Sequence, residues 1–180
     1  METGAASGAM ERVEFEAWRD DDPVPWAPTG RRYVTVNELL VRLGSFGMGL
    51  TWRMRADEDD DWLSGIVKLS EGGVGTLELL ALLPSDLQAV NADFADYAGT
   101  ELIILLREFD SSSWQLATVD PGVLAEIRRS FPDTTPLAAE SWEENPWWDE
   151  PLPEGWGEQT GRRVVGRACG EAAPLPFEST

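Results

Sequence analysis

Two acidic clusters, one of them rich in tryptophan, contain the residue types in this 180-residue sequence that could support chemistry. The first cluster is a run of five adjacent carboxylates. It consists of Asp57, Glu58, Asp59, Asp60 and Asp61. An EF-hand calcium loop requires alternating oxygen ligands, a central glycine and a terminal bidentate glutamate, and the run lacks that pattern. Because neighbouring carboxylates repel one another and cannot be buried unpaired, we expect a solvated connection here.

The second cluster combines carboxylates with indole rings. Its candidate binding residues are Trp142, Glu143, Glu144, Trp147, Trp148, Asp149 and Glu150. In glycoside hydrolases, aromatic rings stack on sugar faces while two opposed carboxyl groups perform acid/base chemistry. The sequence does not show that two carboxyl groups face each other. A carbohydrate-binding protein or glycoside hydrolase is therefore kept as an alternative function.

The absence of histidine from the sequence removes several classes of enzyme. Ser-His-Asp and Cys-His catalysis, histidine-ligated zinc or iron, and imidazole acid/base chemistry all need that side chain. The single cysteine, Cys169, allows neither an internal disulfide nor a cysteine cluster for a metal. Gly44, Gly47 and Gly49 follow a predicted helix and precede a strand, the reverse of the order in a phosphate-binding loop. We therefore expect no catalytic residues, no metal and no cofactor.

The chain is strongly acidic, with 33 acidic residues against 14 basic ones and a net charge of −19. Such a field repels nucleic acids and anionic membranes and attracts basic surfaces. We therefore expect any macromolecular partner to be a basic protein. The alternative is that the acidity serves only solubility.

The two ends of the chain and its apolar runs bear on location and domain boundaries. The first ten residues are small and acidic, unlike a signal peptide, and no apolar run reaches the roughly 20 residues of a membrane-spanning helix. With one cysteine, this composition predicts a cytoplasmic protein. We expect residues 1–10 to form a disordered leader, residues 11–160 a single domain and residues 161–180 a flexible tail.

The residues between 100 and 131 predict local structure most clearly. Residues 101–109 form a nearly continuous apolar run, typical of a strand buried on both faces in the middle of a sheet. Turn-forming residues at 110–113 lead to a second strand at 114–119. Asp120 as N-cap and Pro121 at the first helical position then begin a helix. The apolar stripe of this helix is formed by Val123, Leu124, Ile127 and Phe131.

Alternation and spacing of apolar residues predict the remaining elements. We expect strands at 11–18, 50–55, 62–69 and 76–83, a helix at 35–46, and another helix that begins after Ser85 and Asp86 and ends at Gly99. The strand at 11–18 has one polar face, which is typical of an edge strand. The segment at 76–83 also favours a helix by composition, although a strand is preferred. Strands on both sides would make the acidic run a hairpin loop.

This order of elements predicts an α+β fold, with one mostly antiparallel sheet of about five or six strands and two or three helices packed on one face. An irregular segment follows at 133–160, with eight acidic residues, four prolines, four tryptophans and no basic residue. Its tryptophans either cover the open face of the sheet or contact a partner. Covering the sheet is the favoured alternative.

The favoured function is a non-enzymatic, acidic protein-binding module that neutralises a basic partner, as an immunity protein or antitoxin neutralises a toxin or a nucleic-acid-acting enzyme. A negative surface speeds association with a cationic target, and carboxylates can replace phosphates in its site. Tryptophans among the carboxylates would supply apolar anchors. On this hypothesis both acidic clusters contact the partner. A structural subunit is the third alternative.

Overall fold

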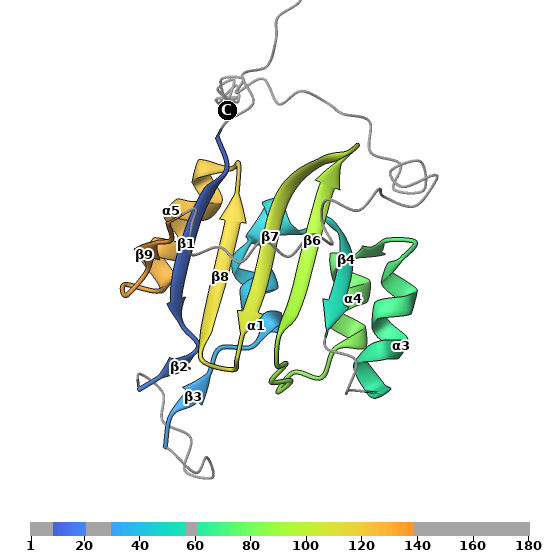
Figure 1. Cartoon of the computed structure of the whole chain (residues 1–180), viewed down its shortest axis with the longest axis horizontal. Coiled ribbons are helices and arrows are strands. Elements are labelled where there is room, and N and C mark those ends of the chain that lie inside the picture. Colours follow the sequence, from blue (N-terminus) through green and yellow to red (C-terminus); the bar gives the residue numbers. More distant parts are fainter. Residues whose placement is uncertain (1–8, 21–29, 57–60, 139–180) are drawn as a thin grey trace, which may run out of the picture.

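The computed structural model describes residues 9–20, 30–56 and 61–138 (Figure 1). The strands are β1 (Glu11–Glu16), β2 (Trp18–Arg19), β3 (Arg32–Tyr33), β4 (Thr51–Ala56), β5 (Val74–Gly75), β6 (Ala92–Ala98), β7 (Glu101–Phe109), β8 (Ser113–Thr118) and β9 (Thr135–Pro136). The helices are α1 (Val36–Arg42), α2 (Gly44–Gly47), α3 (Asp61–Ser70), α4 (Thr76–Leu82) and α5 (Pro121–Ser130).

Seven of these strands form one sheet in the order β5-β4-β6-β7-β8-β1-β9, and each neighbouring pair is antiparallel. β2 and β3 pair in a separate two-stranded ribbon. The helices pack on one face of the seven-stranded sheet, and α1 and α5 lie behind the strands in Figure 1. The predicted α+β class, the mostly antiparallel sheet and the helices on one face are confirmed. The described residues form more strands and helices than the sequence predicted.

β7 lies in the middle of the sheet, as its apolar run predicted. Ile104, Leu105 and Leu106 point alternately to the two faces, and each is at most 1% exposed. Ile104 and Leu106 belong to the main core with the helices, whereas Leu105 belongs to a smaller cluster on the opposite face. The sheet is therefore buried on both faces at its centre.

The helix predicted after Asp120 is α5, and its cap forms as expected. The Asp120 carboxylate accepts hydrogen bonds from the backbone N–H groups of Gly122 at 2.7 Å and Val123 at 3.1 Å. These two donors have no partner within the helix, so the cap satisfies them and fixes where α5 begins. Val123 and Leu124 then pack into the core.

The helix predicted at 35–46 is confirmed in position but is divided in two. Thr35 caps α1 by accepting a hydrogen bond from the backbone N–H of Glu38 at 3.3 Å. Gly44, the first residue of α2, has a φ of +54°, a left-handed conformation that favours glycine, and this conformation ends the continuous helix begun by α1.

The strand predicted at 62–69 is wrong, because these residues belong to α3. The buried side chains Leu63, Ile66 and Ser70 recur at intervals of three and four residues, which places them on one face of a helix. The acidic run therefore joins β4 to a helix, and the predicted hairpin loop is also wrong.

The strand preferred at 76–83 is also wrong, because these residues form α4. Thr76 and Leu79 are buried, but Leu77 is 66% exposed, which is incompatible with a strand buried on both faces. The composition of leucine, alanine and glutamate, which favours helices, decides the local structure here.

The helix predicted between Ser85 and Gly99 is wrong as well. A loop leads to Asn91, whose φ of +53° is left-handed, and β6 then runs between β4 and β7. Phe94 packs in the main core and Ala95 in the cluster on the other face. Because both faces of β6 are covered, apolar residues do not alternate with polar residues along this strand. The spacing of its apolar residues was therefore similar to that of an apolar stripe on a helix.

The strands predicted at 11–18 and 50–55 are confirmed as β1 and β4. Val13 and Phe15 of β1 are buried in the main core. The short β9 pairs along its outer side, so β1 lies one position in from the edge.

Residues 1–8 of the predicted leader 1–10, residues 139–160 of the irregular segment and the predicted tail 161–180 lie outside the described residues. Met10, at the end of the predicted leader, is described and packs against an apolar cluster on the sheet. In the described ranges, no helix has the length and apolar character needed to cross a membrane.

Candidate functional site

The predicted partner-binding residues lie almost entirely outside the described part of the chain. Of these candidates, only Asp61 has a described backbone, as the first residue of α3. Residues 57–60 and the candidates within 142–150 lie outside the described residues. The structure does show that the acidic run follows directly from the end of β4.

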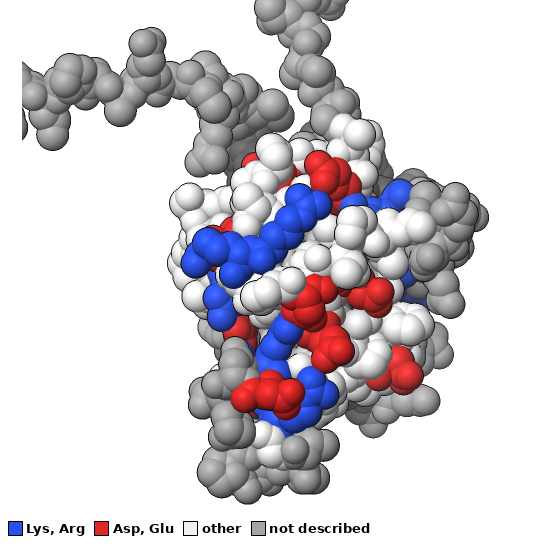
Figure 2. Space-filling model, turned by 90° about the vertical axis from the view of Figure 1, so that its left-hand side faces the viewer, with Lys and Arg blue, Asp and Glu red and all other residues white. Residues whose placement is uncertain are grey.

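The described fold carries the smaller share of the net negative charge. Residues 9–20, 30–56 and 61–138 contain 17 acidic and 11 basic side chains, a net charge of −6. The other residues contain 16 acidic and 3 basic side chains, a net charge of −13. On the side of the molecule that carries β1, β9 and α5, acidic and basic groups are interspersed (Figure 2). Ion pairs such as Arg129–Glu126 at 2.6 Å balance charge within the fold.

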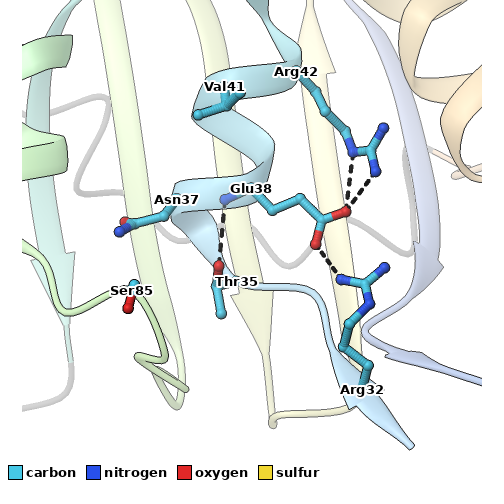
Figure 3. Close-up of a pocket in the computed structure, with 7 residues that line it drawn as sticks. All are labelled: Arg32, Thr35, Asn37, Glu38, Val41, Arg42 and Ser85. Atoms are coloured by element: carbon cyan, nitrogen blue, oxygen red, sulfur yellow. Dashed lines mark hydrogen bonds and ion pairs between the residues drawn. The ribbon is translucent and has the colours of Figure 1, made fainter. Parts of the chain in front are cut away.

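An open depression of about 790 Å³ lies beside α1 (Figure 3). It is lined by Arg32, Thr35, Asn37, Glu38, Val41, Arg42 and Ser85. Glu38 lies between the two arginines: its Oε1 accepts a hydrogen bond from Arg42 Nη2 at 2.7 Å, and its Oε2 accepts one from Arg32. Because one carboxylate holds both cations, we assign these residues to the junction of β3 and α1 rather than to an anion-binding site.

A buried carboxyl group, Glu108, lies at the end of β7. It is 0% exposed, and it accepts hydrogen bonds of 2.9 Å from the Tyr33 hydroxyl and 2.9 Å from the backbone N–H of Asn91. Burial raises the pKa of Glu108 to about 7, although these hydrogen bonds oppose the shift. Burial likewise raises the pKa of Tyr33.

The chain around Glu108 is conformationally unusual. Asn91, Asp110 and Ser111 all have positive φ values, of 53°, 49° and 53°. The backbone N–H of Asp110 donates to the Asn91 side chain at 3.0 Å, which ties the turn between β7 and β8 to the start of β6. A carboxyl that is fully enclosed cannot reach a substrate, so we assign Glu108 to holding these two turns together.

The face of the sheet opposite the helices is the most informative surface of the described fold. Its apolar centre is formed by Ala95, Tyr97, Leu105 and Ala117, all at most 5% exposed. None of the five described helices contributes to this cluster. Among the described residues, Met10, Leu102 and Leu137 pack against it. We call this surface the open face.

Arginine side chains border the apolar centre of the open face. The strand register aligns Arg53, Ala95, Leu105, Ala117 and Arg12 in one row across the sheet. Trp52, Met54 and Val13 point into the main core, so Arg53, Arg55 and Arg12 point to the open face.

The next row across the sheet is Arg55, Asp93, Arg107, Gln115 and Glu14. Arg107 Nε donates to Asp93 Oδ1 at 2.8 Å, and both side chains are almost fully buried. The open face therefore presents four arginines around a small apolar patch. Two acidic residues, Asp93 and Glu14, lie in the same row as Arg55 and Arg107.

Sequence reasoning missed both Glu108 and the arginines that border the open face. The alternation of Arg53 and Arg55 with Trp52 and Met54 was visible, but nothing in the sequence aligned these arginines with Arg12 and Arg107. That alignment depends on pairing between strands distant in the sequence. Within the described ranges, no group of three or more acidic or cysteine side chains is arranged to hold a metal ion.

No protein-family model matches the chain, and no curated protein and no solved structure matches it. The function is therefore inferred from the chain's own residues.

Proposed function

We propose that this chain is an acidic protein-binding module that docks on a basic protein and neutralises it, in the manner of an immunity protein or antitoxin. The proposal rests on one observation: a net charge of −13 of the total −19 lies outside the described fold, and it includes four of the five adjacent carboxylates at 57–61. If the acidic residues served only to balance the arginines of the fold, we would expect them to lie within the fold as partners in its ion pairs.

A concentrated acidic run acts differently from the same charge dispersed over a surface. Five adjacent carboxylates at 57–61 create a strong local field, and that field accelerates encounter with a cationic surface and orients it. In the sequence the run follows the last residue of β4 and ends at Asp61, the first residue of α3.

The second candidate contact region is the tryptophan and carboxylate cluster at 142–150. Tryptophan is among the residues that contribute most to the binding free energy of protein interfaces. The proposed partner is a basic toxin or nucleic-acid-acting enzyme, with its positive substrate-binding surface as the contact. We propose that the complex forms in the cytoplasm.

The test is capture of proteins from a lysate of the host organism on the tagged full-length chain, at low and moderate salt, with identification by mass spectrometry. A matched bait carries the run 57–61 with its carboxylates replaced by amides. The proposal predicts one basic protein, bound in equimolar amount by the wild-type chain and weakly by the matched bait. Equal capture of the same proteins by both baits, or capture of no basic protein, would contradict it.

A further inference from the structure

The centre of the open face is buried, although none of the five described helices packs on it. Leu105 and Ala95 are 0% exposed and Ala117 is 1% exposed, yet the five described helices all pack on the opposite side of the sheet. The described side chains that touch this cluster are Met10, Leu102 and Leu137, which lie at or near the ends of strands. An apolar patch of this kind in the middle of a sheet is normally covered, because water contact with it is unfavourable.

The chain itself arrives at this face where the described residues end. β9 pairs with β1 at the edge of the sheet, and the backbone N–H of Leu137 donates to the Arg12 carbonyl at 3.0 Å. The Leu137 side chain already packs against the cluster of Ala95, Tyr97, Leu105 and Ala117. Residues that follow Ala138 therefore start at the border of the open face.

The composition of the following segment is complementary to this face. Residues 139–160 contain four tryptophans, seven acidic residues and no basic residue. The open face offers a small apolar centre bordered by Arg12, Arg53, Arg55 and Arg107. Tryptophan suits the apolar centre, and carboxylates suit the arginines around it.

The segment is also long enough. The five strands from β4 to β1 span about 19 Å at the usual spacing of about 4.8 Å between strands. An extended chain covers this distance in about six residues at roughly 3.3 Å each, whereas the segment 139–160 has 22.

We infer that residues 139–160 dock on the open face of the chain's own sheet, with tryptophan side chains over Ala95, Leu105 and Ala117 and carboxylates beside the arginines that border them. This docking would assign the tryptophan and carboxylate cluster at 142–150 to the chain's own sheet instead of to the partner, so the proposed function would then rest on the acidic run alone. Docking within the chain leaves the acidic run 57–61 as the region that the proposed partner meets.

The test uses the full-length chain labelled with 5-fluorotryptophan and observed by fluorine NMR. Single Trp→Phe variants assign the resonances of Trp142, Trp147, Trp148 and Trp156. A soluble paramagnetic reagent then reports which indoles are exposed to solvent. Trp52 and Trp114, at 0% and 1% exposed in the main core, serve as internal reporters that the fold is intact.

Docking predicts that at least two of the four resonances are relaxed several-fold less by the reagent than a solvent-exposed indole. The double variant R12E/R53E should restore their full exposure, while the Trp52 and Trp114 resonances remain unchanged. R129E, on the exposed side of α5, is the matched control and should have no effect.

Three results would overturn the inference. The four indoles could all be fully exposed in the wild-type chain, or their protection could be equal in R12E/R53E and R129E. The third result is that the protection of the indoles disappears on dilution as a dimer dissociates. In that case a second copy of the chain covers the open face.

Discussion

The Tyr33 hydroxyl donates a hydrogen bond of 2.9 Å to Oε1 of Glu108, a carboxyl group that is 0% exposed although it lies next to a surface turn. The two residues are 75 positions apart in the sequence, and their contact joins the β2-β3 ribbon to the end of β7. Burial raises the pKa of Glu108 to about 7, from 4.5 in an unperturbed side chain. The burial of Glu108 therefore makes the stability of the fold depend on pH.

The folded state holds the Glu108 proton more tightly than the unfolded chain does. The stabilisation from this group is complete below pH 4.5 and is lost as the pH rises through about 7. The loss amounts to about 3 kcal/mol for a shift of this size. Urea unfolding at pH 5 and pH 8 should show that E108Q removes this part of the pH dependence. E78Q, at an exposed position on α4, should leave the wild-type profile unchanged; a pH profile of E108Q equal to that of the wild type would refute the assignment.

Replacing only one partner of the buried ion pair between Asp93 and Arg107 should strongly lower the free energy of unfolding. R107L leaves the Asp93 carboxylate without its partner at 2.8 Å, and we expect a loss of about 3–5 kcal/mol in the free energy of unfolding. The double variant D93N/R107L removes the stranded charge and should recover part of this loss. Denaturant titration of the wild type, both single variants and the double variant provides the coupling energy. Additive effects would show that the two side chains do not stabilise each other.

Docking of residues 139–160 on the open face predicts a role in stability for Trp147 and Trp148. Replacing either tryptophan by alanine should lower the melting temperature of the full-length chain by at least about 3 °C, because apolar surface on the sheet loses its cover. L77A removes a side chain that is 66% exposed on α4 and serves as control. Unchanged melting temperatures with a weakened partner complex would assign these tryptophans to the partner instead.

The acidic run should act mainly on the rate of association. Replacing the carboxylates of residues 57–61 by amides should slow binding of the basic partner about tenfold at low salt and flatten its salt dependence, with little change in the dissociation rate. A control chain loses the same number of carboxylates at exposed positions elsewhere. These positions are Glu11, Glu71, Glu78, Asp86 and Glu101. Stopped-flow kinetics that are equal for both variants would remove the run from the contact region.

Local signals in the sequence predicted those parts of the fold that neighbouring residues determine. The cap at Asp120, the cap at Thr35 and the apolar run of β7 all act over a few residues, and each is found where the sequence placed it. Turn formers at 110–113 likewise mark the connection of β7 and β8.

The errors arose where the tertiary environment decides between helix and strand. In α3, Leu63 and Ile66 have helical spacing, but the short apolar run also fits a strand. In β6, burial on both faces removes the alternation that would have marked a strand, so Phe94 appeared to continue a helical stripe.

The candidate sites depend still more on long-range pairing. Nothing near Glu108 in the sequence predicts Tyr33 as its hydrogen-bond partner, and the row that joins Arg53 to Arg12 passes through five strands. The acidic run and the tryptophan cluster were recognisable from composition alone, because their residues are neighbours in the sequence and can be identified without knowledge of the fold.

The central claim is that this chain neutralises a basic protein, and titration of the captured partner's activity tests it most directly. The full-length chain is added to the purified partner at a concentration well above the dissociation constant. We predict that activity falls linearly and reaches zero at one equivalent of chain. Full activity of the partner in the presence of several equivalents would contradict the claim.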